Sequence, residues 1–170
     1  DSAMIANGRG EAFDYLLGET TTESAREAIR ECAARLRNAR RPVISVNGNT
    51  VVLAGDGAIR LAAVLGCPLE VNLYYRTPSR VRGLISLLEE LRFNVSKEDA
   101  PDAFDGDWKD SVEGVSLLGD SPNFRIEGLE GPRSKCTREG IGEADTILVP
   151  LEDGDRCEAL ISLGKEILVV

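Results

Sequence analysis

The feature that most constrains the fold is a short run of β-preferring residues that ends in an amide-rich turn. Residues 42–46 read Pro-Val-Ile-Ser-Val, and Asn47, Gly48 and Asn49 follow before an apolar segment that can start a helix. Such a run is typical of a buried parallel strand. Asn47 and Gly48 tolerate a positive φ, and Asn49 is a good N-cap. Open α/β sheets bind ligands just past the carboxyl end of a strand, although an ordinary strand-to-helix turn uses the same residues.

Strand and helix patterns alternate along the rest of the chain. The patterns predict helices at residues 11–17, 22–39, 58–65, 78–92 and 157–163, and strands at residues 68–74, 146–150 and 166–170. The helix after the first strand is expected to be broken or to start late, because Gly55 and Gly57 interrupt its pattern, and to stop at Gly66. The alternation predicts a parallel sheet flanked by helices, and 170 residues fit one α/β domain over residues 1–170.

Residues 96–113 break this alternation. The segment is rich in Asp and Glu and carries Trp108, the one tryptophan of the sequence. We interpret it as an acidic loop inserted into the domain, with a short helix around Trp108 and a solvated surface.

The charge balance and the missing residue types exclude several classes of function. The net charge is −9, from 20 basic and 29 acidic residues, which argues against nucleic acid or an anionic membrane as a partner. No apolar run approaches the ~20 residues of a membrane span and no basic leader is present, so a cytoplasmic protein is expected. Histidine is absent, which excludes His-dependent triads and HExxH zinc chemistry. The four cysteines are scattered, without metal or disulfide spacing.

Two arginines stand beside predicted helix starts, where backbone N–H groups and the helix dipole favour anions. Arg9 lies in the loop Gly8-Arg9-Gly10, and Arg76 precedes the helix that Pro78 opens. Further candidates for binding an anion are Arg80, Lys135 and Arg156. For each of these cations, an ordinary surface position remains the alternative.

Five segments resemble, in order, the archaeal 4-phosphopantoate–β-alanine ligase family, also called phosphopantothenate synthetase. They are GRGEAFDYLLGE at residues 8–19, PVISVNGN at 42–49, EVNLYYRT at 70–77, GLEGPR at 128–133 and ADTILVPLEDGDRCEAL at 144–160. The resemblance implies a Rossmann-like fold, a homodimer and a function in coenzyme A biosynthesis. The implied reaction joins 4-phosphopantoate to β-alanine with ATP and Mg²⁺, and releases AMP and diphosphate through a phosphopantoyl-adenylate.

The same resemblance suggests roles for the candidate residues. Gly8, Arg9 and Gly10 would bind ATP, and Arg76 the phosphorylated acid. Asn47, Asn49 and Asn72 follow two neighbouring strands, so their amides could bind the pantoyl hydroxyl, its phosphate or the acyl-adenylate carbonyl, with Asn47 also catalytic. Glu152, Asp153 and Asp155 follow the strand at 146–150 and could bind Mg²⁺ or take the proton of the β-alanine ammonium, with Asp153 and Asp155 the catalytic candidates. For the asparagines, turn formation and capping remain the alternative, above all for Asn49, and for the acidic group helix capping has equal weight.

The sequence also departs from the family pattern. The family's N-terminal helical segment with an ATP-contacting arginine, and its C-terminal nucleotide loop, are expected to be absent, and Asn7 stands where members usually have histidine. Two hypotheses therefore remain: an AMP-forming ligase, and an inactive ligand-binding or dimerisation module of the same fold. A dinucleotide-binding enzyme is disfavoured, because no G-x-G-x-x-G follows the first strand.

Overall fold

The computed structural model describes residue 18, residues 20–150 and residues 154–170. The helix predicted at residues 11–17 lies outside this part of the chain. The contacts within the chain divide it into two units, Asp1–Arg37 and Asn38–Val170. Nearly all of α2 (Glu23–Asn38), the amphipathic helix predicted at residues 22–39, belongs to the first unit. The second unit holds the entire sheet and forms a single α/β domain.

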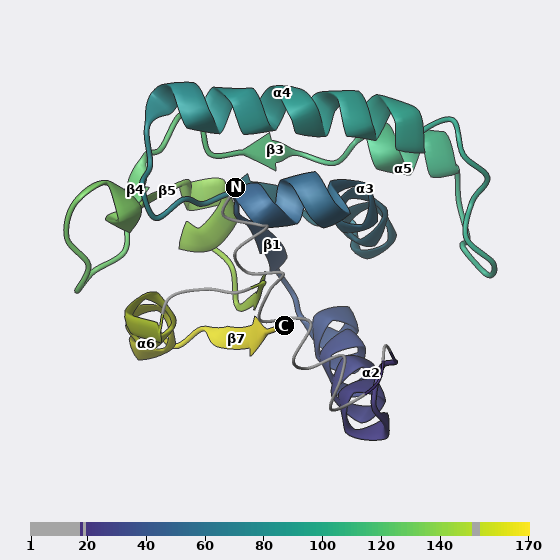
Figure 1. The fold of residues 1–170 in the computed structure, drawn as a ribbon, viewed down its shortest axis with the longest axis horizontal. Helices are drawn as coiled ribbons and strands as arrows, with labels where there is room; N and C mark the ends of the chain where they lie inside the picture. Colours follow the sequence, from purple (N-terminus) through teal and green to yellow (C-terminus); the bar gives the residue numbers. More distant parts are fainter. Residues whose placement is uncertain (1–17, 19, 151–153) are drawn as a thin grey trace. The chain divides into compact units, whose positions relative to one another are not determined.

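Five parallel strands form this sheet. They are β1 (Pro42–Val46), β2 (Leu69–Val71), β3 (Leu117–Leu118), β6 (Thr146–Val149) and β7 (Glu166–Val169), in the spatial order β3-β2-β1-β6-β7, and β1, β3 and β7 are labelled in Figure 1. The chain starts in the middle with β1, adds β2 and β3 on one side, and then crosses to β6 and β7. The order therefore reverses between β1 and β6, where Val43 pairs with Ile147. This topology confirms the Rossmann-like parallel sheet.

The handedness of each crossover between parallel strands sets the face of the sheet on which its helix packs. α3 (Gly48–Leu65) packs against α4 (Pro78–Val95), and these two helices contact β1, β2 and β3. α6 (Gly154–Ser162) contacts β7. A separate buried cluster joins side chains of β1, β6 and α6 to the turn after β5; its members include Val43, Ile141, Ile147, Val149 and Leu160.

The start of α3 differs from the prediction at two points. Asn47, not Asn49, is the N-cap, and its φ of −103° is not in the left-handed region; Asn49 lies in the first turn. The helix begins at Gly48, so the late start is wrong, but non-helical angles at Ala54 kink it one residue before Gly55, which confirms the predicted break. The side-chain cap of Asn47 and the packing of Gly55 favour the early start. A Cβ on Gly55 would lie 2.7 Å from Cδ1 of Leu91, so this glycine permits the close contact between α3 and α4.

The other end of α3 agrees with the prediction, because Gly66 caps it in the left-handed conformation with a φ of 62°. With 18 residues and a mean hydropathy of 1.2, α3 is long and apolar enough to cross a membrane by length and composition alone. Here it packs against α4 and β1, which is the position of a core helix in a globular domain.

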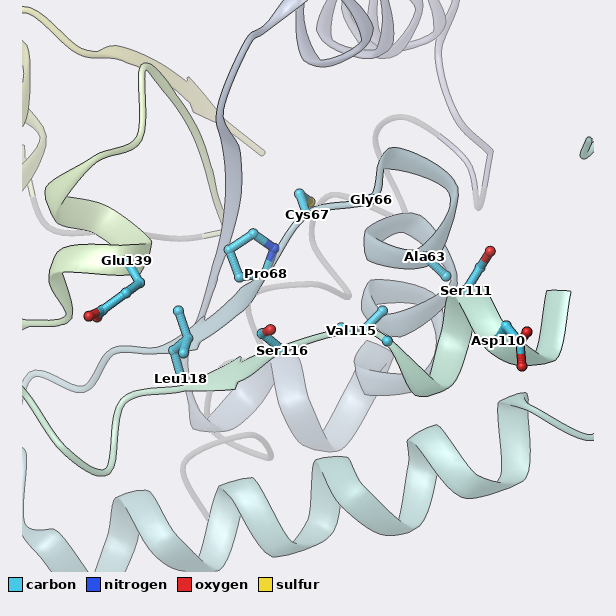
Figure 2. Close-up of a pocket in the computed structure, with 11 residues that line it drawn as sticks. Ala63, Gly66, Cys67, Pro68, Asp110, Ser111, Val115, Ser116, Leu118 and Glu139 are labelled. Carbon is cyan, nitrogen blue, oxygen red and sulfur yellow. The ribbon is translucent and has the colours of Figure 1, made fainter. Parts of the chain in front are cut away.

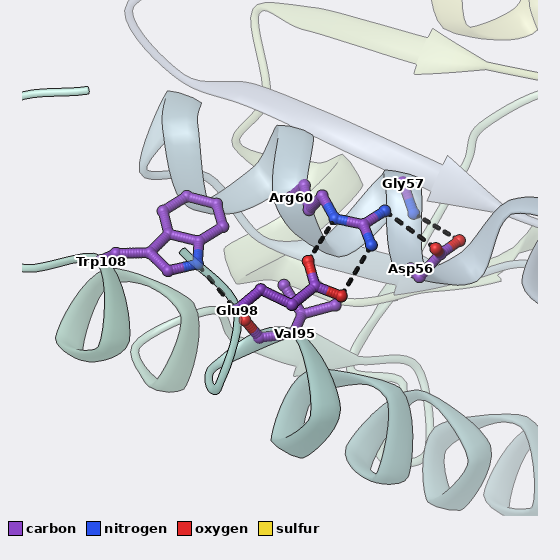
Figure 3. A network of polar contacts seen from close by, with 6 residues as sticks. All are labelled: Asp56, Gly57, Arg60, Val95, Glu98 and Trp108. Atoms are coloured by element: carbon purple, nitrogen blue, oxygen red, sulfur yellow. Dashed lines mark hydrogen bonds and ion pairs between the residues drawn. The ribbon is translucent and has the colours of Figure 1, made fainter. Parts of the chain in front are cut away.

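The acidic segment forms the predicted short helix, α5 (Trp108–Glu113), and is anchored on the α3–α4 layer. Trp108 is 7% exposed, and its Nε1 donates to the carbonyl oxygen of Val95 at 3.3 Å. Arg60 on α3 donates to both carboxylate oxygens of Glu98 at 2.8 Å and to Asp56 at 2.8 Å (Figure 3). The segment thus has one buried aromatic anchor and one polar anchor.

The region between β3 and β6 contains four short elements that the sequence patterns do not predict. They are β4 (Phe124–Arg125), η1 (Pro132–Ser134), β5 (Lys135–Cys136), which pairs antiparallel with β4, and the π-turn η2 (Arg138–Gly142). β2 is shorter than expected, and α6 begins at Gly154 instead of Cys157.

Candidate functional site

Asn47 bridges the point where the strand order reverses. Its Oδ1 accepts hydrogen bonds from Thr50 N at 3.0 Å and Thr50 Oγ1 at 3.1 Å, which caps α3. Its Nδ2 donates to the carbonyl oxygen of Pro150, just past β6, at 3.0 Å. One amide therefore links the carboxyl ends of β1 and β6, which is where open α/β sheets bind their ligands.

Asn72 lies on the other side of β1, just past β2, and is 3% exposed. Its Nδ2 donates to Ser45 Oγ at 3.1 Å and to the carbonyl oxygen of Glu70 at 3.3 Å. Its Oδ1 is buried without a hydrogen-bond partner. The carbonyl of Glu70 fixes this amide orientation, because the flipped amide would place two acceptors against each other. A ligand atom that reaches Asn72 Oδ1 must therefore be a donor, such as a hydroxyl, and not a phosphate or carbonyl oxygen.

Arg76 is half-buried and connects the ends of β2 and β3. Its Nη1 donates to the carbonyl oxygen of Val71 at 3.3 Å, and its Nη2 donates to the carbonyl oxygen of Gly119. Burial lowers the pKa of Arg76, and the nearby carboxylate of Glu70 acts in the opposite direction. Gly119 has a φ of 128°, and a Cβ there would lie 2.8 Å from Val71 O, so only glycine fits. The guanidinium thus faces backbone carbonyls, and its predicted contact with a phosphate stays a prediction.

Arg133 joins three segments at the same edge. Its guanidinium carbon lies 4.6 Å from the ring centroid of Tyr74, and its Nη2 donates to Asp155 Oδ1 at 2.5 Å. Asp155, in the first turn of α6, also accepts a hydrogen bond from its neighbour Arg156 N at 2.9 Å. The hydrogen bond from Arg133 is the largest cause that holds the pKa of Asp155 below its usual value. Asp155 is therefore an ion-pair partner and a weak base, which does not favour its predicted catalytic role.

Two charged side chains of the site are almost completely buried. Glu70 on β2 is 0% exposed, and Arg156 on α6 is 2% exposed. Burial raises the pKa of Glu70, while hydrogen bonds from Ile141 and Thr137 and the positive charge of Arg156 act against that rise. Arg156 Nη1 donates to the carbonyl oxygen of Arg133 at 3.4 Å, which ties α6 to the loop that carries Arg133.

The structure thus brings together part of the predicted site. Asn47, Asn72, Arg76 and Asp155 all lie past the carboxyl ends of the parallel strands, and Asn49 is exposed on the first turn of α3. Gly8, Arg9, Gly10 and Asp153 lie outside the described residues, so their predicted roles stay predictions. Glu152 also lies outside them. Within residues 20–150 and 154–170, no three Asp, Glu, Cys or His side chains converge as metal ligands.

Sequence reasoning missed Glu70, Tyr74 and Arg133. A signal was present for two of them: Glu70 is a lone charge in the apolar strand Leu-Glu-Val, and Arg133 lies in a Gly/Pro-punctuated basic loop. A charged residue inside a buried strand needs partners from elsewhere in the chain, and these cannot be located by local patterns.

A pocket of about 390 Å³ lies at the opposite end of β2 and β3, near the amino ends of these strands (Figure 2). Pro68 and Ser116, which precede the two strands, line it together with Cys67 and Ser111. The residues that line it are not among those predicted for the site, and it is separate from the carboxyl edge.

Fold and geometry define the chain as a Rossmann-like α/β protein with polar side chains at the strand-order reversal. The phosphopantothenate/pantothenate synthetase family model matches residues 24–170, and the chain belongs to this family. It is 46% identical over 99% of its length to a 4-phosphopantoate–β-alanine ligase of Thermococcus kodakarensis, and 45% identical over 99% to that of Thermococcus onnurineus. The enzyme of that name from Methanosarcina mazei is 42% identical over 98% of the chain. The chain spans 57% of the length of each of these curated relatives.

Proposed function

We propose that the protein is a ligase that joins 4-phosphopantoate to β-alanine in coenzyme A biosynthesis. The observation that carries the proposal is the polar carboxyl edge of the sheet in a chain of this family: Asn47 follows β1, Asn72 follows β2, and Arg133 binds Asp155 in the first turn of α6. The relatives that bear this activity in their names align with almost the whole chain, which supports the same substrates here. Because its proposed substrates are soluble metabolites, we propose that the protein acts in the cytoplasm.

The proposed reaction needs an activated carboxylate, because a free carboxylate is a poor acyl donor. A carboxylate oxygen of 4-phosphopantoate attacks the α-phosphorus of ATP and diphosphate leaves; the β-alanine nitrogen then attacks the acyl carbon and AMP leaves. Alignment of these in-line attacks and stabilisation of charge are the main tasks of the protein. Mg²⁺ would be held chiefly by the phosphates of the nucleotide, as is common for this ion.

The residues at the edge support specific roles in this reaction. Asn72 Oδ1 has no hydrogen-bond partner among the described residues and is an acceptor, so it fits a donor such as the hydroxyl of the pantoyl group. Arg133 supplies positive charge that an otherwise acidic protein needs to hold a phosphorylated acid. Because Asp155 is a weak base, the phosphate of AMP is the proposed acceptor of the amine proton.

The test is to incubate the protein with ATP, Mg²⁺, β-alanine and 4-phosphopantoate labelled with ¹⁸O in its carboxylate, and to analyse the products by mass spectrometry. The proposal expects phosphopantothenate and AMP that carries one ¹⁸O atom from the carboxylate. Release of ADP and phosphate would reject the adenylate and indicate an acyl phosphate. Heat of binding with 4-phosphopantoate but no product would support the inactive binding module instead.

The proposal includes a homodimer, as the family resemblance implies. Val52 and Leu53 on α3 are 68% and 74% exposed, and Tyr75 after β2 is 75% exposed, so apolar surface is available for a partner. Light scattering coupled to size exclusion tests this, with a monomer at micromolar concentration as the contradicting result.

A further inference from the structure

Glu70 is a buried carboxylate that holds a distant segment of the chain. Its Oε1 accepts a hydrogen bond from Thr137 N at 3.0 Å, and its Oε2 accepts one from Thr137 Oγ1 at 2.7 Å and one from Ile141 N at 2.8 Å. The side chain is 0% exposed. Such a fully buried carboxylate is stable only when its oxygens are satisfied, and here one short segment supplies all three of these donors.

The π-turn is shaped around this carboxylate. Gly140 lies between the two donor residues, and a Cβ there would be 2.0 Å from Glu70 Oε2 and 2.7 Å from Thr137 Oγ1. The backbone at Gly140 is also non-helical, with φ −98° and ψ −113°. The turn therefore wraps the carboxylate so closely that no side chain fits between them.

A second contact joins the same two segments of the chain. Glu70 accepts a hydrogen bond from Thr137. Tyr74, four residues after Glu70, has its ring under the guanidinium group of Arg133, which lies four residues before Thr137. The two segments thus pass each other in opposite directions and are held at two points. Between these points lie Asn72 on one segment and β5 on the other. The contact at Glu70 is buried and has three hydrogen bonds, whereas the ring of Tyr74 at the second contact is half exposed.

We propose that Glu70 is a positioning residue that sets Arg133 at the carboxyl edge for the anionic substrate, an inference that rests on the proposed function. Glu70 does not itself touch the substrate, because it is enclosed by the π-turn. Its carboxylate fixes the backbone of Thr137, and the short strand β5 transmits this position to Arg133. Loss of the carboxylate removes the hydrogen bonds that fix Thr137, while the contacts of Arg133 with Tyr74, Asp155 and Arg156 remain.

The variant Glu70→Gln tests the inference, because it keeps the size of the side chain but turns one acceptor into a donor that faces N–H and O–H donors. We expect the KM for 4-phosphopantoate to rise by about tenfold and the KM for ATP to stay within about twofold. The matched control is Glu98→Gln, which removes a carboxylate that also accepts two hydrogen bonds, but from Arg60 on α3. This control is expected to leave both KM values unchanged.

A double-mutant cycle separates positioning from general stability. If Glu70 acts through Arg133, Glu70→Gln adds less than about twofold to the KM for 4-phosphopantoate in an Arg133→Ala background. An additive effect in that background, or an equal rise in both KM values, would overturn the inference. Should Glu70→Gln not fold, the pair Thr137→Val and Thr137→Ser applies, since only serine retains the hydroxyl that donates to Glu70. Rescue of the KM by serine is then the expected result, and equal behaviour of the two variants overturns the inference.

Hydrogen–deuterium exchange provides a readout that does not depend on the reaction. In Glu70→Gln, amides of residues 131–141 are expected to exchange at least tenfold faster, while amides of β1 and β6 keep their rates. If the wild-type protein forms no product, the proposed function fails, and the exchange experiment still decides whether Glu70 holds this segment. Unchanged exchange at residues 131–141 would overturn the positioning role even in an active enzyme.

Discussion

The guanidinium group of Arg133 lies over the ring of Tyr74, with 4.6 Å between the guanidinium carbon and the ring centroid. Tyr74 is 52% exposed, so the pair sits at the surface of the carboxyl edge and not in the core. The ring holds one face of the guanidinium while Asp155 binds its edge. This arrangement orients the guanidinium group at the carboxyl edge.

The first prediction concerns this ring. Tyr74→Phe keeps the aromatic face, and its affinity for 4-phosphopantoate is expected to stay within about twofold of wild type. Tyr74→Leu removes the face and should weaken binding by about two- to fivefold, the value of an exposed cation–π contact. Titration calorimetry measures both, with Phe93→Leu, at an exposed aromatic residue on α4, as the control. Equal affinities of the Leu and Phe variants would contradict a role for the ring.

The second prediction concerns the cap of α3. Asn47→Ala removes the hydrogen bonds to Thr50 and to Pro150 O, and is expected to lower the free energy of unfolding by about 1–3 kcal/mol. Asn47→Ser keeps an oxygen that caps a helix and loses the donor to Pro150, so its loss should be smaller. Urea unfolding followed by circular dichroism gives both values. A cost for Ser as large as that for Ala would show that the bridge to β6, not the cap, carries the stability.

The third prediction concerns the titration of Asp155. Its pKa lies below the usual value of 3.8 because of the hydrogen bond from Arg133, so it stays ionised at neutral pH. Its contribution to stability is present above pH 3.8 and is lost as the pH falls through the lower folded pKa. Asp155→Asn should therefore leave the limbs of the kcat–pH profile between pH 5 and 9 in place. Disappearance of a limb in that variant would restore Asp155 as the catalytic base.

The fourth prediction concerns the anchor of the acidic segment. Trp108→Ala is expected to lower the free energy of unfolding by about 3–5 kcal/mol, because the indole is 7% exposed and lies 5.2 Å from the ring of Phe104. Phe93→Ala is the control, since Phe93 is 61% exposed. Chemical denaturation followed by circular dichroism measures both variants. Similar small losses would mean that the segment is not docked in solution.

The fifth prediction concerns the thiols. Burial raises the pKa of Cys67 and of Cys136 to about 12, and their side chains are 5% and 0% exposed. At pH 8 iodoacetamide should therefore modify Cys32 and Cys157 in the native protein, and all four cysteines after unfolding. Intact-mass spectrometry counts the adducts. Native labelling of Cys136 at the rate of Cys157 would show that the core around β5 opens.

The parts of the fold that were predictable rest on local signals. Residues 42–46 and 146–149 are apolar runs because both faces of a parallel strand are buried, and Pro78 and Gly66 mark helix ends through their own backbone preferences. The choice of Asn47 over Asn49 as N-cap was not local. It depended on Pro150, more than a hundred residues away, because a second hydrogen bond favours the amide that reaches β6.

The candidate site was predictable only in outline. The rule that ligands bind past the carboxyl ends of strands located Asn47 and Asn72 correctly at that edge. The partners of Glu70 and Arg133 were not predictable, since Thr137 and Tyr74 are brought to them by the crossovers of the sheet. The predicted roles of Arg9 and Asp153 stay predictions, because both residues lie outside the described part of the chain.

The tight approach of Gly119 to Val71 has a consequence for the variation that this loop tolerates. The carbonyl oxygens of both residues accept from Arg76, and the space between the two backbones is smaller than a methyl group. A directed-evolution library of the loop can lengthen it on either side of Gly119, but it will return glycine at that codon in every functional clone. Changes of substrate preference must therefore come from positions other than Gly119.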